Sequence, residues 1–199
     1  MKRYGKDQSV SRYALLIVDM IKDNVQIGGE GLLDAEATKI VPSINRLSEA
    51  FRRASQRVVF ACDSFMEGDF IFGGRMKPHA IRGTGGDHPL PELGMQPSDL
   101  FLPKRRMSSF HKTDLDQTLR TWGVDTVVVC GIQTSVCVLL TAMDAIQNDF
   151  KAVIVRDACA CHKPEIHEMT LGVYDPLVLY PLMRIMTTDE MVHELNQLT

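Results

Sequence analysis

Residues 126–146 read TVVVCGIQTSVCVLLTAMDAI, and this stretch indicates which fold the chain adopts. It opens with a run of β-branched residues, 126–129, which is typical of a strand buried on both faces of a parallel sheet. It closes with apolar residues at helical spacing between positions 138 and 146. A short turn at 131–135 joins the two, and Thr134 or Ser135 is placed to cap the helix. The stretch therefore predicts a strand, a tight turn and a helix of an open α/β sheet.

Cys137 falls in the first turn of that predicted helix, just beyond the carboxyl end of the strand. Ligands of open α/β sheets bind at this edge, and unpaired N–H groups at a helix start stabilise a thiolate. The alternative is a buried cysteine that only fills the core, which is common for free thiols. Cys137 is therefore a candidate nucleophile that needs a base nearby.

Composition limits the class of protein. The chain has 199 residues, of which 45% are hydrophobic, and this favours a single domain over residues 1–199. A net charge of −3 with mixed signs gives no basic face, so we expect no nucleic-acid partner. We expect neither a membrane span nor a signal peptide, because Asp19 interrupts the apolar run at 14–18. Five cysteines, an odd number, predict reduced thiols and a cytoplasmic protein.

The rest of the chain alternates between strand and helix patterns. We predict strands at 13–18, 57–61, 100–103, 126–129, 151–155 and 183–186, and helices at 34–56, 114–122, from 165 and from 189. The long irregular stretch at 64–98 predicts a functional loop or lid. This alternation implies a parallel sheet with right-handed crossovers and helices on both faces.

Chemically capable side chains follow several of the predicted strands. They are Asp19, Asp63, Lys104, Cys137 and Asp157. Burying a carboxylate such as Asp19 is costly without a charged partner, and Lys104 is the natural one. Lys112 is the rival, but its polar neighbours are typical of a solvated helix start. Asp63 and Asp157 could instead cap the loop or helix that follows each of them.

Four segments resemble the isochorismatase-like cysteine hydrolases, a family that includes nicotinamidases, N-carbamoylsarcosine amidohydrolases and ureidoacrylate amidohydrolases. The segments are ALLIVDM at 14–20, PHAIRGTGG at 78–86, KRRMSSFHKTDLDQTLRTWGV at 104–124 and VVVCGIQTSVCVLLTAMDA at 127–145. With the strand at 151–155, the resemblance spans nearly the whole chain. It implies a three-layer α/β/α fold with a six-stranded, mostly parallel sheet.

The resemblance also implies a catalytic triad of Asp19, Lys104 and Cys137. Asp19 would take the thiol proton, Lys104 would support the thiolate, and Cys137 would attack a carbonyl to form a thioester that water hydrolyses. A cis peptide at Ile132–Gln133 would turn the N–H of Gln133, together with that of Cys137, towards the developing oxyanion. The function implied is a cysteine-dependent amidohydrolase that releases ammonia from a small amide or ureido (N-carbamoyl) compound.

The sequence departs from the metal-dependent nicotinamidases of this family. Asp63 and His79 match two metal-ligand positions, but Phe65 stands where a ligating histidine should be, so we expect no metal and no cofactor. Asn24 replaces the aromatic residue that nicotinamidases place against a pyridine ring. Arg82 could bind a substrate carboxylate bidentately. Asn24, Phe65 and Arg82 are thus the candidate substrate-binding residues, and a small acyclic substrate is expected.

Other functions remain open. Within the family, the alternative is a nicotinamidase-type pyridine carboxamide hydrolase; outside enzymes, it is a catalytically silent binding or regulatory protein. Cys159, Cys161 and His162 could mark a thiol–metal or redox site, although their spacing is too tight for an ordinary zinc knuckle. Papain-like chemistry with His79 or His111 lacks an orienting partner. The resemblance further implies a homodimer or homotetramer whose neighbouring subunits can complete the pocket.

Overall fold

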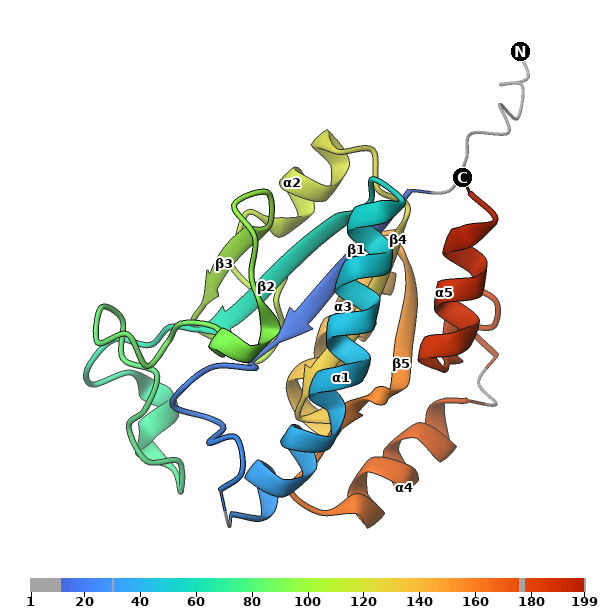
Figure 1. The fold of residues 1–199 in the computed structure, drawn as a ribbon. Coiled ribbons are helices and arrows are strands. Elements are labelled where there is room, and N and C mark those ends of the chain that lie inside the picture. Colours follow the sequence, from blue (N-terminus) through green and yellow to red (C-terminus); the bar gives the residue numbers. More distant parts are fainter. Residues whose placement is uncertain (1–11, 30, 176–177, 199) are drawn as a thin grey trace.

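The computed structural model describes residues 12–29, 31–175 and 178–198, and these form one six-stranded sheet with helices around it (Figure 1). The elements are β1 (Tyr13–Val18), α1 (Leu32–Arg53), β2 (Arg57–Asp63), η1 (Phe70–Gly73), η2 (Pro91–Leu93), β3 (Leu100–Lys104), α2 (Leu115–Thr121), β4 (Thr126–Ile132), η3 (Thr134–Val138), α3 (Leu139–Gln147), β5 (Lys151–Ala160), α4 (Pro164–Tyr174), β6 (Met183–Met186) and α5 (Thr188–Asn196). Every neighbouring strand pair is parallel. The expected three-layer α/β/α fold is confirmed.

Helices cover both faces of the sheet. In Figure 1, α1 crosses in front of the strands with α5 beside it, and α3 lies behind them. The apolar face of α1 places Ile40, Ile44, Leu47 and Phe51 in the core, at the spacing that brings side chains to one side of a helix. The strands β1 and β4 are buried along their whole length, as their continuous apolar runs predict.

The strand order places a topological switch point between β1 and β4. The sheet runs β3-β2-β1-β4-β5-β6, so the chain builds outward on one side of β1 and then returns to its other side. Parallel sheets bind ligands in the crevice outside the carboxyl ends of the two strands at such a point. Asp19 directly follows β1, and Cys137 follows β4 by five residues. The fold therefore brings the two candidate residues to one crevice.

Gly131 allows β1 and β4 to approach closely at this crevice. It pairs with Val18 and has a φ of 107°, a backbone conformation that residues with a side chain rarely adopt. A Cβ atom at this position would lie 2.2 Å from the carbonyl oxygen of Val18. Only glycine fits here without moving the strand that precedes Cys137.

The prediction of a side-chain cap on the helix after β4 was wrong. The N-cap position is Gln133 and has no side-chain cap, and the chain enters a π-helical turn, η3, before α3 begins. The Val138 N–H donates to the carbonyl of Gln133 at 3.2 Å, which closes this wider turn. Thr134 Oγ1 instead contacts His167 Nδ1 at 2.8 Å, and Ser135 Oγ lies 3.5 Å from Cys161 Sγ. The two hydroxyls thus contact α4 and the residue that follows β5.

The strand β5 is longer than predicted, and this removes Asp157 from the group of strand-end residues. The strand continues to Ala160 after a register shift opposite Val129 and Gly131 of β4. Asp157 therefore lies inside β5, where its Oδ1 accepts from the N–H and Oγ1 of Thr188 at 2.7 and 3.0 Å. It thereby holds the first residue of α5, whose N-cap is Thr187, and does not cap the loop or helix that follows it in sequence.

The segment 64–98 contains two short 3-10 helices, η1 and η2, and otherwise irregular chain. A parallel bridge between Phe65 and Ile81 closes the segment on itself, and an antiparallel bridge joins Pro89 to Ile21, just after β1. Across the residues that the structure describes, no helix combines the length and the apolar character that crossing a membrane requires.

Candidate active site

Lys104 is the centre of a buried ionic cluster at the crevice. It is the last residue of β3, and its side chain is fully buried. Its Nζ donates to Asp19 Oδ2 at 2.8 Å, to Asp63 Oδ1 at 2.5 Å and to the carbonyl of Arg106 at 3.2 Å. Three acceptors match the three protons of an ammonium group. Lys104 is thus held in one orientation between two carboxylates, whereas Lys112 is exposed.

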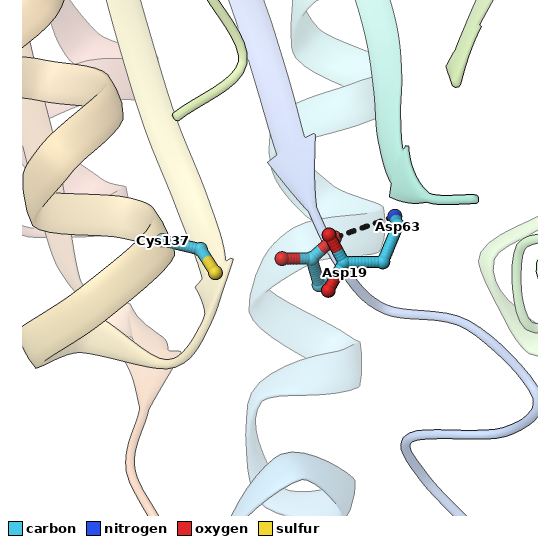
Figure 2. Close-up of side chains that lie close together, drawn as sticks. All are labelled: Asp19, Asp63 and Cys137. Atoms are coloured by element: carbon cyan, nitrogen blue, oxygen red, sulfur yellow. Dashed lines mark hydrogen bonds between the residues drawn. The ribbon is translucent and has the colours of Figure 1, made fainter. Parts of the chain in front are cut away.

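The carboxylate of Asp19 is fixed from both sides. The backbone of Asp19, directly after β1, takes a left-handed conformation with a φ of 55°. Asp19 Oδ2 accepts from Lys104. Its Oδ1 accepts from the backbone N–H of Asp63 at 2.8 Å, and this hydrogen bond is the dashed line in Figure 2. The ends of three adjacent strands, β1, β2 and β3, therefore supply this arrangement.

Cys137 faces these carboxylates from the other side of the crevice. Figure 2 shows its sulfur directed at the carboxylate of Asp19. One carboxylate oxygen of Asp19, one carboxylate oxygen of Asp63 and the sulfur of Cys137 all lie within 4.8 Å of one another. The thiol is 7% exposed and contacts Met107 Sδ at 3.8 Å. A thiol, two carboxylates and a cation are therefore assembled in one place, which are the groups that a thiol-dependent reaction needs.

Burial and mutual charge govern the protonation of this cluster. Burial raises the pKa of Cys137 well above its ordinary value, and the charge of Asp19 raises it further. Burial also raises the pKa of Asp63 to about 7, with the charge of Asp19 acting in the same direction and Lys104 opposing it. Burial lowers the pKa of Lys104, but the negative charges around it outweigh this and raise it. The site therefore rests as a neutral thiol beside a firmly charged ammonium.

The backbone between β4 and η3 has an unusual geometry next to Cys137. The Ile132–Gln133 peptide bond is cis. The Gln133 side chain is held by His162, whose Nδ1 lies 2.7 Å from Gln133 Oε1. His162 follows β5 by two residues, and His167 of α4 contacts Thr134 in the same turn. Sequence reasoning missed both roles, since no spacing in the chain links these histidines to the turn before Cys137.

A cavity of about 400 Å³ opens onto Cys137. Its lining combines the ionic cluster with apolar and polar side chains from four parts of the chain. The lining residues are Asp19, Asp23, Asn24, Leu33, Asp63, Met76, Lys77, His79, Met107, Ile132, Gln133, Val136 and Cys137. A volume of this size suits a small molecule.

Of the three predicted substrate-binding residues, Asn24 lines this cavity and the other two do not. Asn24 Nδ2 donates to the carbonyl of Asp19 at 3.1 Å. Phe65 is fully buried and packs its ring edge-on against Phe72 and His79. Arg82 lines a different cavity, where its Nε donates to Ser64 Oγ at 3.1 Å. The expectation that Phe65 and Arg82 line the substrate cavity is therefore wrong.

A backbone ladder explains where Phe65 and Arg82 point. The N–H of Phe65 donates to the carbonyl of Ala80 at 2.9 Å, and the N–H of Arg82 donates to the carbonyl of Phe65 at 2.8 Å. This pairing forms a short parallel bridge outside the six-stranded sheet, and side chains alternate across such paired segments. The register, which cannot be read from the sequence, therefore directs Arg82 away from Cys137.

The donors at this site do not fit a metal ion. Among the described residues, one group could hold an ion, namely Asp19, Asp63 and Cys137, but Lys104 already donates to both of its carboxylates. A cation there would lie beside an ammonium group. His79 is absent from the group, and its Nδ1 lies 2.8 Å from the carbonyl of Lys77. Cys159 and Cys161 likewise belong to no such group in the part of the chain that is described.

Comparisons with known proteins agree with this fold. A sequence model of the isochorismatase domain matches residues 13–188. A ureidoacrylate amidohydrolase of Stutzerimonas stutzeri is 32% identical over 179 residues, which cover 78% of this chain and 72% of the relative. Crystal structures of an isochorismatase-like hydrolase from Alkaliphilus metalliredigens and of N-carbamoylsarcosine amidase from Thermoplasma acidophilum align with TM-scores of 0.79 and 0.74, at 30% and 31% identity. The alignments cover 94% and 89% of this chain and 98% and 97% of those chains. The chain belongs to the isochorismatase family of hydrolases.

Proposed function

We propose that this protein is a cysteine-dependent amidohydrolase that releases ammonia from a small amide or ureido (N-carbamoyl) compound. The observation that carries the proposal is the position of Cys137 opposite Asp19, with the buried ammonium of Lys104 between two carboxylates. Relatives named as ureidoacrylate amidohydrolase and N-carbamoylsarcosine amidase support the same bond type. A catalytically silent binding protein would have no need of this costly buried cluster.

In the proposed reaction, Asp19 accepts the proton of the Cys137 thiol while the sulfur attacks the carbonyl carbon of the substrate. Lys104 stays protonated and stabilises the negative charge that the cluster carries in that state. The backbone N–H groups of Gln133 and Cys137 receive the oxyanion. The tetrahedral intermediate then expels ammonia, which takes the proton from Asp19, and leaves a thioester on Cys137.

Hydrolysis of the thioester completes the cycle. Asp19, again unprotonated, takes a proton from a water molecule that attacks the thioester carbonyl. The second tetrahedral intermediate collapses, the Cys137 sulfur leaves, and it regains a proton from Asp19. An amide substrate thus yields a carboxylic acid, and a ureido substrate yields a carbamic acid.

The cavity favours a small acyclic substrate over a pyridine carboxamide. Apart from the imidazole of His79, none of its described lining residues is aromatic, so an aromatic substrate would find little surface for ring stacking. The polar lining, with Asn24, Lys77 and Gln133, offers hydrogen-bond partners instead. We propose no metal and no cofactor for this reaction, because Lys104 occupies the carboxylates that would have to bind an ion.

The test is an ammonia-release assay over a panel of aliphatic amides, N-carbamoyl amino acids, ureido acids and nicotinamide. Cys137→Ala is expected to abolish turnover of the accepted substrate and to keep the native melting temperature. Cys130→Ala is the matched control, because Cys130 is a fully buried thiol of β4 outside the cavity. Trapping an acyl or carbamoyl adduct on Cys137 by rapid quench and mass spectrometry would identify the nucleophile. Full turnover by Cys137→Ala would disprove the mechanism, and nicotinamide as the best substrate would disprove the substrate class.

A further inference from the structure

A second cavity, of about 290 Å³, has a lining that is almost entirely basic. Apart from Pro103, its lining residues are Arg82, Arg105, Arg106, His111 and Lys112. The chain as a whole carries more acidic than basic residues, 25 against 22, so this clustering is not a general property of its surface. The cavity shares no lining residue with the cavity at Cys137. It is a separate concave, cationic feature of the fold.

One carboxylate is shared by two of these arginines. Arg105 forms a two-pronged ion pair with Asp69, in which its Nε lies 3.1 Å from Asp69 Oδ2. Arg106 Nη1 lies 3.9 Å from the same carboxylate. The hydrogen bond from Arg105 lowers the pKa of Asp69 to about 2, so this carboxylate stays charged. A single negative charge thus faces two guanidinium groups, which leaves one positive charge in excess.

Arg82 and Lys112 add charge that no ion pair balances. Arg82 donates to Ser64 through Nε at 3.1 Å and through Nη2 at 3.4 Å, and both acceptors are neutral oxygens. Over residues 12–29, 31–175 and 178–198, neither Arg82 nor Lys112 has a carboxylate within salt-bridge distance. The same holds for His111 in that part of the chain. Arg82 and Lys112 thus add two charges to the one left in excess beside Asp69, so the cavity carries about three unbalanced positive charges.

Backbone hydrogen bonds fix the segments that carry these side chains. The N–H of Ser64 donates to the carbonyl of Lys104 at 2.8 Å, and the N–H of Arg82 donates to the carbonyl of Phe65 at 2.8 Å. Within the stretch 103–112, the N–H of His111 donates to the carbonyl of Ser108 at 3.3 Å. Residue 82 and the stretch 103–112, which are distant in sequence, thus converge on one concavity, so little ordering is required when an anion binds.

We infer that this cavity binds a doubly charged oxyanion of the phosphate type, either free phosphate or the phosphoryl group of a small metabolite. Guanidinium forks match the tetrahedral oxygens of such an anion, and a lysine contributes a further point charge. A monocarboxylate would leave most of this charge unbalanced. Arg82 and Arg106 are the main ligands, since Arg105 is already engaged with Asp69. Lys112 completes the site.

The experiment is isothermal titration of the full chain with inorganic phosphate and with glycerol 3-phosphate, at constant ionic strength set with sodium chloride. Saturable binding is expected, and Arg82→Gln and Lys112→Gln should each weaken it by roughly ten- to a hundredfold, the loss typical of a charged hydrogen bond. Arg46→Gln is the matched control, because Arg46 is an exposed arginine outside the cavity. Tighter binding of glycerol 3-phosphate would identify an organic phosphate as the ligand, and equal or weaker binding would identify the free ion.

Three results would overturn the inference. The first is the absence of saturable binding for either anion up to about 10 mM, where affinity is too weak to be specific. The second is an equal loss of affinity in Arg46→Gln and Arg82→Gln, which would mean that only the net charge matters. The titration is repeated with Cys137→Ala, which should bind with unchanged affinity because the two cavities share no residue. Loss of binding in Cys137→Ala would place the anion at the active-site cavity and also refute the inference. Anion binding and turnover are thus tested independently, so a failure of the anion-site inference can be told apart from a failure of the proposed hydrolysis.

Discussion

Replacing Lys104 by methionine should destabilise the fold in a way that depends on pH. Methionine keeps a long apolar stem but removes the ammonium that lies between Asp19 and Asp63. Both carboxylates are almost fully buried, with exposures of 2% and 4%. Without a cation, two negative charges remain side by side in a medium of low polarity.

The magnitude follows from this burial. Breaking a buried ion pair by removing one partner typically costs about 3–5 kcal/mol in the free energy of unfolding. We expect a loss of this size at pH 8, because the pKa of Asp63 is raised to about 7 and this carboxyl group of the native protein is then mostly ionised. At pH 5 Asp63 is protonated in the folded state, so one charge at most is left unpaired and the loss should be clearly smaller.

The sign of this pH dependence comes from the carboxylates and not from the lysine. The pKa of Lys104 is raised in the folded state, so its contribution is complete below its ordinary pKa of 10.5 and is lost only at higher pH. Between pH 5 and 8 the ammonium is therefore always charged in the native protein. In Lys104→Met, Asp63 loses the cation that opposes its raised pKa, so it holds its proton more tightly than in the unfolded chain and stability falls as pH rises.

Urea denaturation at pH 5 and pH 8, followed by circular dichroism, measures this effect. Lys39→Met is the control, because Lys39 forms an exposed pair with Glu36 and should change stability by less than about 1 kcal/mol at either pH. The double variant Lys104→Met/Asp63→Asn should regain part of the loss at pH 8. If Lys104→Met lost less than about 1 kcal/mol at pH 8, or lost the same amount at both pH values, the buried ionic cluster described here would be wrong.

Four further outcomes are expected. Gly131→Ala should lower both stability and turnover, because its Cβ would lie 2.2 Å from the carbonyl oxygen of Val18; an unchanged melting temperature and unchanged kcat would contradict this. Asp63→Asn should flatten the stability–pH curve between about pH 4 and pH 7, since a carboxyl whose pKa is raised to about 7 stabilises the fold at low pH and loses that contribution as pH rises; a curve of unaltered slope is the negative result. Exhaustive chelation should leave turnover intact, and recovery of activity only on adding a metal would refute the proposed absence of a metal. Light scattering should detect a homodimer or homotetramer, which exposed apolar side chains such as Met169 and Val173 of α4 favour; a monomer at micromolar concentration would exclude this proposal.

Much of the fold could be predicted from the sequence alone because strand and helix patterns report burial directly. The runs at 13–18 and 126–129 are continuous because those strands are covered on both faces. Side chains at the carboxyl ends of parallel strands share one edge, which is why the sequence could group Asp19, Asp63, Lys104 and Cys137, although it wrongly added Asp157; the triad of Asp19, Lys104 and Cys137 came from the family resemblance. Their pattern also carried the family resemblance.

What only the tertiary structure decided depends on contacts between distant segments. The extension of β5 past Asp157 and the π-helical turn before α3 are set by hydrogen bonds to neighbouring strands and carbonyls, which local periodicity does not report. The direction of Arg82 likewise depends on the bridge between Phe65 and Ile81, since a shift of one residue would turn its side chain to the other face. Residue type could therefore suggest an anion-binding arginine, but only the register decided which cavity it lines.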